Sequence, residues 1–489
     1  MPEHILESCV PLPIPEKELI EVTVKAKDWA IMHGAGMRSK TDYNPDNMFF
    51  VPFILTPSSF PRKEFNRAIK LQKILNELMH WVAHDVEFLR TTLAQTIKVD
   101  DFTAKLFGLY EAVLEKGVVQ PISLGLIRSD IMLETRCGDN NERKTKCYCC
   151  WKQVEINTIA SGFGHLGPIS KEIQRYVLQE LDQGSKLKDL PENNALSGIC
   201  AAMARAWEVA SNPAGVILFV IEDVSYNICD QRFHEFEIRE KHPHIKVVRK
   251  TLTQIFEQGS HGPNKELIVD GNYVNVVYFR AGYEPGHYHS QNEWDARYLI
   301  EFSKAIKCPT INYHLAGTKK VQQALAAPGI LKRFVNDPEK IQAIREIFTG
   351  LYSLDDDEAG NEAYKMALAD PERFVLKPQR EGGGNNVYGK DIPAVLEAMT
   401  PTERSSWILM ERIQPPISRG YMVRPGGPMP PTLVDLVSEL GIFGAIIGDN
   451  TMIIENYQAG HMLRTKLTTA NEGGVAAGAG ALDSPYLTD

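Results

Sequence analysis

The sequence predicts a mixed α/β fold, and three regions of the chain carry that prediction. An unbroken apolar run, a helical stretch and two further strand-like runs follow one another at residues 215–221, 229–241, 245–248 and 274–279. Strand, helix and strand joined by short connections favour a parallel sheet. Residues 1–120 have mostly helical patterns, whereas residues 375–457 mix strands with loops rich in glycine and proline.

The composition is that of an ordinary globular protein. The chain has 489 residues, of which 43% are apolar and 24% charged, so it is long enough for several domains and a large core. A net charge of −9 argues against nucleic acid or an anionic membrane as the main partner. We see neither a signal-peptide pattern nor an apolar run long enough to cross a bilayer, and therefore expect a cytosolic protein.

Near the N-terminus, Ser59, Phe60 and Pro61 are typical of a helix start, with serine as N-cap and proline at the first helical position. Apolar residues then recur at helical spacing until about Thr92. This pattern predicts one long amphipathic helix whose apolar stripe lies in the core. Further helices are expected at about 293–306 and over most of residues 310–375.

Cysteine and histidine patterns do not favour a metal site. Four of the eight cysteines lie between Cys137 and Cys150, but their spacing is not that of a zinc site. We expect a loop that leads into a strand. His80 and His84 are one helical turn apart, but the glutamate of a zinc-protease helix is absent, so a packed or solvated helix face is expected.

Residues 374–389 are the most informative stretch of the chain. A short apolar strand leads to Lys377, and Glu381 then precedes three consecutive glycines. Glycine N–H groups approach an anion closely, lysine binds phosphate, and a carboxylate beside phosphate oxygens is typical of a Mg²⁺ site. This stretch predicts a loop that holds ATP for chemistry, with a glycine-rich surface turn as the plain alternative.

A second glycine pattern offers a rival function. Residues 162–167 fit G-x-G-x-x-G, with a strand-like run before them and a helical run from about Ser170. That context fits an NAD(P)-dependent oxidoreductase. The acidic residue expected about 20 positions later is not convincing, because Glu180 and Asp182 lie in or just after the helical run. No GxxxxGK[ST] pattern is present, which disfavours a Walker-type NTPase.

Polar residues in three other segments are candidates for the same chemistry. Glu155 and Asn157 alternate with apolar residues, so they share one strand face and could join Glu381 as oxygen ligands of Mg²⁺; a solvated face is the alternative. Lys319 and Lys320 open a helix, where a bound anion would offset the unfavourable helix dipole, and solvated lysines are the alternative.

Two basic segments complete these candidates. Arg464 and Lys466 alternate along a strand-like stretch and therefore share a face. Arg128 ends an apolar run at 122–127, and an arginine at a strand end suits a carboxylate. The small residues at 473–480 favour a loop that covers a substrate, with a disordered tail as the alternative.

Six motifs occur in one order along the chain: Arg-Ser-Asp, Glu-Ile-Asn-Thr-Ile, Leu-Ala-Gly-Thr-Lys-Lys, Lys-Pro-Gln-Arg-Glu-Gly-Gly-Gly-Asn-Asn, Arg-Thr-Lys and Gly-Gly-Val-Ala-Ala-Gly. Together they resemble the eukaryotic-type glutathione synthetase family of the ATP-grasp superfamily. The resemblance covers nearly the whole chain, and the decamer that begins at Lys377 is its most specific part.

The resemblance implies an ATP-grasp core with a helical N-terminal region. Residues 1–205 would form that region and the first part of the core, and residues 206–306 a Rossmann-like substrate-binding domain. Residues 307–489 would complete the core, with a glycine-rich lid at about 375–430 and a substrate loop at 467–481.

The implied reaction joins γ-glutamylcysteine and glycine to glutathione with ATP and Mg²⁺, through an acyl phosphate, in a homodimer. The implied metal ligands are Glu155, Asn157 and Glu381. The implied nucleotide-binding residues are Glu155, Lys319, Lys377, Gly382, Gly383, Gly384, Asn385, Asn386, Tyr388, Met410, Glu411, Arg412, Ile413, Glu439, Lys466 and Glu472. The implied substrate-binding residues are Arg128, Ser161, Asn227, Gln231, Arg280, Tyr283, Arg464, Val475 and Ala476. Arg464, Lys319 and Lys377 are the implied catalytic residues.

The sequence departs from the family pattern in two places. Ala160 and Gly162 stand where the family usually has serines, with Ser161 between them, which affects hydroxyl contacts to the cysteine part of the substrate. A nucleotide-binding regulator without turnover therefore stays an alternative. The insertion at 138–150 is longer than usual and has no assigned role. The Val-Ala-Ala segment favours glycine as acceptor, with a β-alanine ligase as the alternative.

Overall fold

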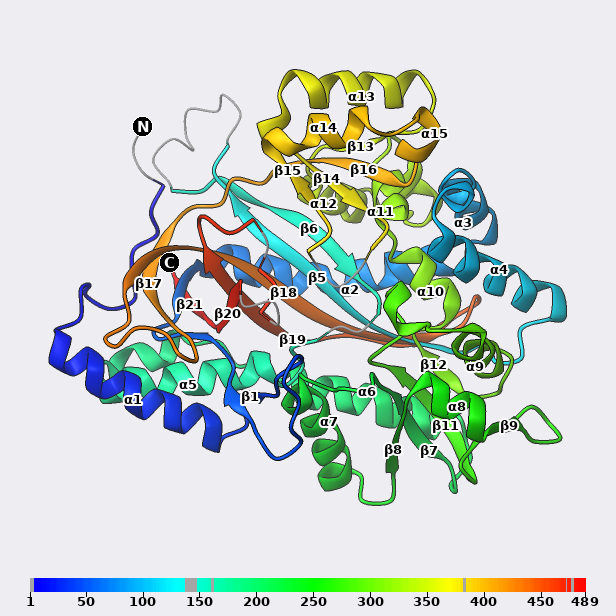
Figure 1. Cartoon of the computed structure of the whole chain (residues 1–489), viewed down its shortest axis with the longest axis horizontal. Coiled ribbons are helices and arrows are strands. Elements are labelled where there is room, and N and C mark those ends of the chain that lie inside the picture. Colours follow the sequence, from blue (N-terminus) through cyan, green and yellow to red (C-terminus); the bar gives the residue numbers. More distant parts are fainter. Residues whose placement is uncertain (1–3, 137–146, 160–161, 381–383, 472, 476–478) are drawn as a thin grey trace.

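The computed structural model describes residues 4–136, 147–159, 162–380, 384–471, 473–475 and 479–489. A large central sheet runs through the molecule, a parallel sheet lies below it, and a smaller sheet with its helices lies above (Figure 1). The α/β fold class predicted from the sequence is confirmed.

The central sheet is almost entirely antiparallel. Among the described residues its strand order is β17-β3-β20-β19-β18-β5-β6, and only β20 and β3 run parallel. Its strands are β3 (Phe53–Ile54), β5 (Ser123–Glu134), β6 (Cys150–Asn157), β17 (Ser418–Val423), β18 (Leu433–Gly448), β19 (Ile453–Leu467) and β20 (Gly480–Asp483). Since β5 continues to Glu134, Arg128 lies in the middle of a strand and not at its end, which corrects the sequence prediction.

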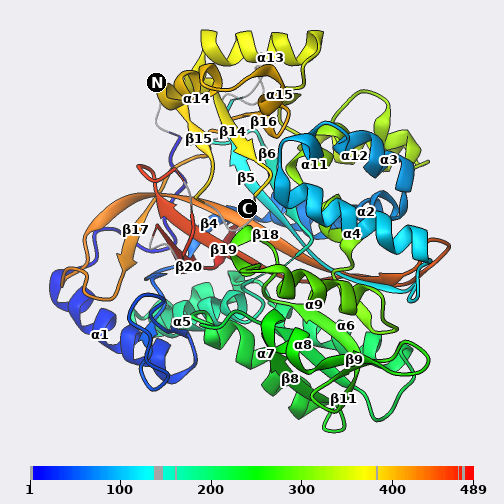
Figure 2. The ribbon, with the colours of Figure 1, turned by 45° about the vertical axis from the view of Figure 1, so that its right-hand side comes forward.

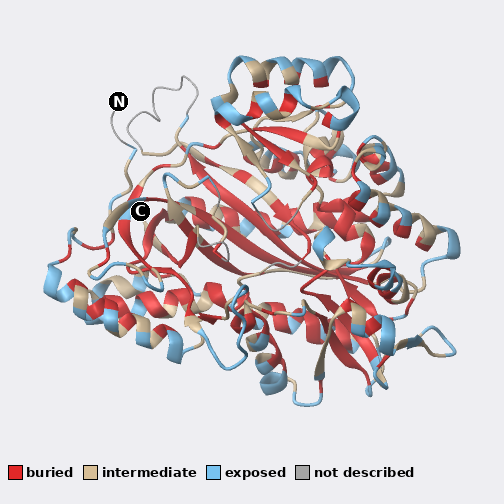
Figure 3. Ribbon diagram, viewed as in Figure 1, coloured by how far each residue is buried: buried red, intermediate tan, exposed pale blue. Residues whose placement is uncertain are grey.

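Helices cover both faces of β18. Ile442 and Ile446 join the core formed with α2 (Arg62–His84), whereas Phe443 and Ala445 join the core formed with α6 (Ala195–Val209). Successive side chains of a strand point to opposite faces, so a strand covered on both sides requires an unbroken apolar run. Figure 3 shows the resulting buried layer across the middle of the molecule.

The predicted helix start at Ser59 is wrong. Residues Ser58–Pro61 form strand β4, which pairs in parallel with β21 (Pro485–Thr488), and α2 begins only at Arg62. Backbone pairing with a segment more than 400 residues away in the chain overrides the local capping pattern.

The predicted single long helix is two helices. Asp85 has extended backbone angles, and its carboxylate accepts a hydrogen bond from the Phe88 N–H, so it caps α3 (Val86–Leu93). His80 is buried and hydrogen-bonded through both ring nitrogens, to the Tyr313 hydroxyl and the Asp449 carbonyl. The packed helix face expected for the two histidines is therefore confirmed.

The predicted parallel sheet is confirmed. β8, β7, β11 and β12 run parallel as neighbours, and β10 and β9 extend the sheet (Figures 1 and 2). α9 ends at Glu301, five residues before the predicted position, because the chain then turns into β12. The elements are β7 (Val216–Val220), α7 (Ile228–Lys241), β8 (Lys246–Lys250), α8 (Leu252–Gln258), β9 (Gly259–His261), β10 (Leu267–Val269), β11 (Asn272–Phe279), α9 (Gln291–Glu301) and β12 (Ile306–Cys308).

Two strands of the smaller sheet, β14 and β15, flank the glycine-rich stretch in the sequence. The strand order of this sheet is β13-β16-β14-β15, and the apolar strand predicted before Lys377 is confirmed as β14. The elements of this part are β13 (Leu351–Ser353), α13 (Glu358–Ala369), β14 (Phe374–Pro378), β15 (Val387–Tyr388), α14 (Ile392–Glu397), α15 (Pro401–Arg404) and β16 (Trp407–Glu411).

The remaining elements connect and cover these sheets. They are α1 (Glu16–Met32), β1 (Gly36–Met37), β2 (Phe49–Phe50), α4 (Asp101–Lys116), α5 (Leu166–Glu180), α10 (Ile311–Ala316), α11 (Lys319–Leu325) and α12 (Pro338–Ile347). Within the described ranges, the helices are all too short or too polar to span a bilayer.

Candidate active site

A cavity of about 640 Å³ lies where β5, β6, β18 and β19 of the central sheet meet the smaller sheet. Most of the residues predicted from the sequence line it. These are Arg128, Glu155, Asn157, Asn227, Arg280, Tyr283, Lys319, Lys377, Asn385, Asn386, Tyr388, Met410, Glu411, Arg412, Ile413, Glu439, Arg464, Lys466 and Val475.

Other predicted residues do not line the cavity or lie outside the described residues. Gln231 and Gly384 are described but are not part of the cavity lining. The predictions for Ser161, Glu381, Gly382, Gly383, Glu472 and Ala476 fall outside the described residues.

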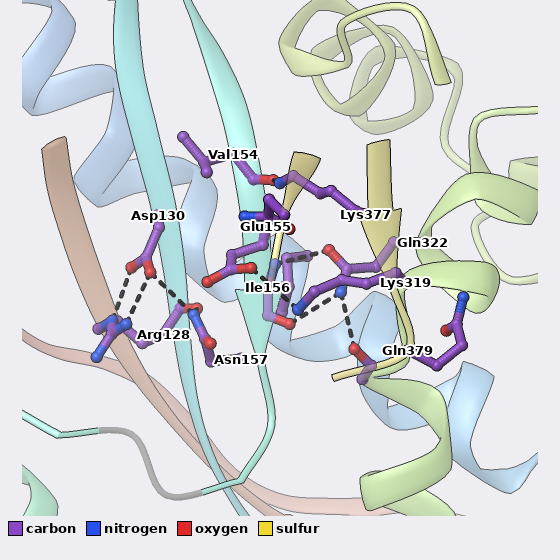
Figure 4. Close-up of polar contacts among 12 residues, drawn as sticks. Arg128, Asp130, Val154, Glu155, Ile156, Asn157, Lys319, Gln322, Lys377 and Gln379 are labelled. Carbon is purple, nitrogen blue, oxygen red and sulfur yellow. Dashed lines mark hydrogen bonds and ion pairs between the residues drawn. The ribbon is translucent and has the colours of Figure 1, made fainter. Parts of the chain in front are cut away.

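Two buried lysines and a glutamate meet on one side of the cavity. Lys319 is the first residue of α11, and its Nζ lies 3.0 Å from a carboxylate oxygen of Glu155 on β6. Lys377 comes from β14, and its Nζ donates to the Val154 carbonyl at 3.0 Å (Figure 4). Three segments far apart in the chain thus place two cations beside one carboxylate.

The charges around Glu155 decide its ionisation. Burial raises the pKa of the Glu155 carboxyl, but the neighbouring charges of Lys319, Lys377 and Arg464 outweigh that effect. The pKa therefore lies below its ordinary value, and Glu155 is ionised at neutral pH. A buried carboxylate that stays ionised is suited to bind a hard cation.

Asn157 offers a second oxygen on the same strand. Its Nδ2 donates to a carboxylate oxygen of Asp130 at 2.9 Å and to the Arg128 carbonyl at 3.3 Å. Because both of these partners accept hydrogen bonds, they fix the orientation of the amide and leave its Oδ1 as an acceptor. Glu155 and Asn157 thus supply the carboxylate and carbonyl oxygens that Mg²⁺ prefers, and the described residues fit that ion.

Arg464 and Glu439 form an ion pair across neighbouring strands. They lie opposite each other on β19 and β18, and both Nε and Nη2 of Arg464 donate to one carboxylate oxygen of Glu439. Burial lowers the pKa of Arg464, but Glu439, Asp130 and Glu155 outweigh it, so that pKa lies above its ordinary value. Burial and the negative charges of Asp130 and Glu155 raise the pKa of Glu439, although the positive charge of Arg464 opposes them.

An apolar wall faces these charges. Side chains from five separate strands or loops form one buried cluster, made of Met132, Val375, Met410, Ile413 and Val437, and Tyr388 packs against it. An apolar wall with a few polar groups is typical of a small-molecule or cofactor site.

Sequence reasoning missed Met132, Val375 and Val437. The alternation of strands could have found them, because each stands two residues from a predicted site residue or its motif and therefore shares that residue's strand face. The cavity lining also includes Met37, Lys40 and Val51 from the N-terminal region, for which no local pattern gave a signal.

Substrate residues predicted in the parallel-sheet region lie at another side of the cavity. Arg280 is buried and forms an ion pair with Asp230 on α7 at 3.2 Å. Gln231 is buried beside the cavity, where its Nε2 donates to Oδ1 of Asn227 and its Oε1 accepts from Arg249. Among the described residues, its hydrogen bond to Asn227 links it to the cavity lining.

The dinucleotide interpretation of residues 162–167 is wrong. In a dinucleotide site, the N–H groups at the start of the helix bind the pyrophosphate. Here the Asp230 carboxylate accepts from the N–H groups of Phe163 at 2.8 Å, His165 at 3.0 Å and Leu166 at 3.2 Å. A side chain of the protein thus occupies the position of the phosphate.

Comparisons with known proteins agree with this geometry. Residues 16–487 match the family model described as eukaryotic glutathione synthase, ATP binding domain. The chain is 42% identical to glutathione synthetase of Mus musculus and 41% identical to that of Homo sapiens, in each case over 474 residues, 96% of this chain and 97% of the relative.

The fold also has a counterpart among solved structures. The apo structure of a glutathione synthetase-like effector from Globodera pallida superimposes with a TM-score of 0.78 and 26% sequence identity, covering 99% of this chain and 100% of that one. With a family model over nearly the whole chain and relatives of this identity, the chain belongs to the eukaryotic glutathione synthase family.

Proposed function

We propose that this protein ligates γ-glutamylcysteine and glycine to glutathione, with conversion of ATP to ADP and phosphate. The observation that carries the proposal is the meeting of Lys319, Lys377, Glu155 and Arg464 in one cavity beside an apolar wall. Family membership supports the same reaction.

In the first step, an oxygen of the cysteinyl carboxylate attacks the γ-phosphorus of ATP. The new O–P bond gives an acyl phosphate, and the bond to the β-phosphate oxygen breaks to release ADP. Negative charge is concentrated where the carboxylate meets the γ-phosphate. The ammonium groups of Lys319 and Lys377 line the cavity and lower the energy of the transition state, because they are already in place. Catalysis is then mainly positioning and charge neutralisation, and no nucleophilic side chain is required.

In the second step, the glycine amine attacks the carbonyl carbon of the acyl phosphate. The C–N bond forms, the C–O bond to phosphate breaks, and the amine gives up a proton as phosphate leaves. The Arg464 guanidinium lines the same cavity as Lys319, Lys377 and Val475 of the C-terminal loop. Arg464 is suited to hold a carboxylate near the reacting carbon.

Glu155 and Asn157 are proposed to hold Mg²⁺, with Glu381 as a third ligand predicted from the sequence. Mg²⁺ would supply charge neutralisation on the phosphate oxygens. Lys319 pairs with Glu155, so this lysine and the proposed metal would share one carboxylate.

The test is ADP release with Mg²⁺, γ-glutamylcysteine and glycine, and with each substrate omitted in turn. We expect ADP formation to require the dipeptide, and ¹⁸O in its C-terminal carboxylate to be transferred to the released phosphate. Nucleotide binding without turnover on any dipeptide would instead identify a regulator. Faster turnover with β-alanine than with glycine would reject glycine as the acceptor.

The domain division at residues 205 and 306, the homodimer and the cytosolic location stay predictions. The parallel sheet, from β7 to β12, supports a separate substrate-binding unit between these boundaries. Light scattering with size-exclusion chromatography tests the dimer, limited proteolysis the boundaries, and cell fractionation the location.

A further inference from the structure

Asp130 is a fully buried carboxylate next to residues that line the cavity, and of the roles above only the orientation of the Asn157 amide involves it. It lies on β5 with 0% of its surface exposed, between β18 on one side and β6 on the other. An ionised group buried to this extent is stable only if it is paired and hydrogen-bonded, so its partners show what it does in the structure.

Three site residues converge on this one carboxylate. Nε and Nη2 of Arg128 each lie 2.7 Å from a different oxygen, which is the bidentate arrangement of a guanidinium and a carboxylate (Figure 4). Nδ2 of Asn157 donates to Oδ2 at 2.9 Å, and Nη2 of Arg464 lies 3.7 Å from the same oxygen. These partners are, respectively, a proposed substrate, metal and reaction-centre residue.

The neighbouring strand leaves room for the group. Gly441 on β18 is paired with Asp130, and a Cβ at that glycine would lie 2.8 Å from Oδ1 of Asp130 and 3.0 Å from Cδ of Arg128. Any larger residue at 441 would therefore displace the carboxylate–guanidinium pair. The glycine on β18 thus leaves the space that the Asp130–Arg128 pair on β5 occupies.

We propose that Asp130 is a positioning residue, which orients Arg128 toward the dipeptide and turns the Oδ1 of Asn157 toward the metal. This inference rests on the proposed function. Asp130 does so because its two oxygens accept hydrogen bonds from Arg128 and Asn157, which fixes both the guanidinium plane and the amide orientation, while Arg464 adds a nearby positive charge. Residues that orient metal ligands typically change metal affinity by about 10- to 100-fold when they are replaced.

Asp130→Asn is the direct test, because it keeps the shape and replaces one acceptor with a donor. The new amide faces the N–H groups of Arg128 or Asn157, and Asn157 must then turn its own amide and withdraw Oδ1 from the metal. We expect Mn²⁺ binding, measured by electron paramagnetic resonance with a non-hydrolysable ATP analogue, to weaken by about 10-fold or more. Calorimetry should show a similar loss for γ-glutamylcysteine, with metal-free nucleotide affinity changed less than about twofold.

The double variant Asp130→Asn/Asn157→Asp exchanges the donor and the acceptor and keeps the net charge. We expect it to recover Mn²⁺ affinity relative to Asp130→Asn, since an oxygen of residue 157 again faces the metal and the hydrogen bond between the two positions is restored with donor and acceptor exchanged. If Asp130→Asn does not fold, the exchange variant is compared with Asn157→Asp alone, and tighter Mn²⁺ binding by the exchange variant is the supporting result.

Glu301→Gln is the matched control, because Glu301 pairs with Arg297 in an equally buried ion pair that does not line the cavity. It should lower the melting temperature and leave Mn²⁺ and dipeptide affinities unchanged. The inference is overturned if Asp130→Asn behaves like this control, or if the exchange variant recovers nothing. Absence of dipeptide-dependent ADP release in the unmodified protein would instead reject the proposed function.

Discussion

Glu155 illustrates how a residue's chemistry depends on distant parts of the chain. Alone on a strand face it is an ordinary solvated acid, and that alternative was open from the sequence. In the structure it lies 3.0 Å from the ammonium group of Lys319, which comes from a segment 164 positions later in the chain. The lysine pairs with Glu155 and lowers its pKa, so the carboxylate stays ionised, as the proposed role of binding a cation requires.

Glu155→Gln is expected to lower kcat by about 100-fold, because it removes the charge that holds the metal while keeping the size of the side chain. Steady-state ADP release at saturating ATP measures the effect. Glu111→Gln, which removes an acid from an exposed pair with Arg90, is the control and should retain activity. Activity of Glu155→Gln close to that of the unmodified protein would exclude Glu155 from the metal site.

At the scale of elements, Asp230 connects three parts of the substrate region. Its carboxylate accepts from backbone N–H groups at the start of α5, pairs with Arg280 after β11, and itself belongs to α7. Burial raises the pKa of Asp230, but the Arg280 guanidinium and the backbone donors outweigh burial and hold it below its ordinary value. The loop at 162–166 is therefore held by an internal anion.

Asp230→Asn should destabilise the protein by about 3–5 kcal/mol, since it leaves the Arg280 guanidinium buried without its opposite charge. Urea unfolding followed by circular dichroism measures the loss. Asp357→Asn is matched to it, because Asp357 is the N-cap of α13 but is exposed, and asparagine caps a helix about as well as aspartate. Equal stability of the two variants would contradict the proposed role of Asp230.

At the scale of the whole molecule, several histidines are buried in their neutral form. Burial lowers the pKa of His461 to about 3, and it lowers the pKa values of His80 and His234 to about 4. In the unfolded chain these groups regain the ordinary value of about 6.5. At these histidines the unfolded state therefore binds more protons than the folded state between these values, so their contribution to the free energy of unfolding falls as the pH falls below about 6.5.

Each of these histidines should contribute up to about 1.4 kcal/mol per pH unit between pH 6.5 and its folded pKa. We expect the urea midpoint to be constant from pH 8 to 7 and to drop steeply from pH 6 to 5. Calorimetric unfolding in buffers of different ionisation enthalpy should detect net proton uptake in that range. A midpoint unchanged between pH 7 and 5 would contradict the neutral burial of these side chains.

Local patterns determined much of the fold. The parallel sheet, strand β14 before Lys377, and the helix opened by Lys319 were predictable, because each depends on an apolar run or on residues within a few positions. The start of α2 was not predictable. Ser59 and Pro61 have good local reasons to cap a helix, but pairing of β4 with β21 uses their backbone in a strand.

The sequence by itself determined which residue types bear the chemistry and, through motif resemblance, the family to which they belong. Only the tertiary structure decided their partners: Asp130 with Asn157 and Arg464, Asp230 with the start of α5, and the apolar wall around Tyr388. The physical reason is that hydrogen bonds and burial depend on distances in space, and these contacts join segments that the chain order keeps far apart.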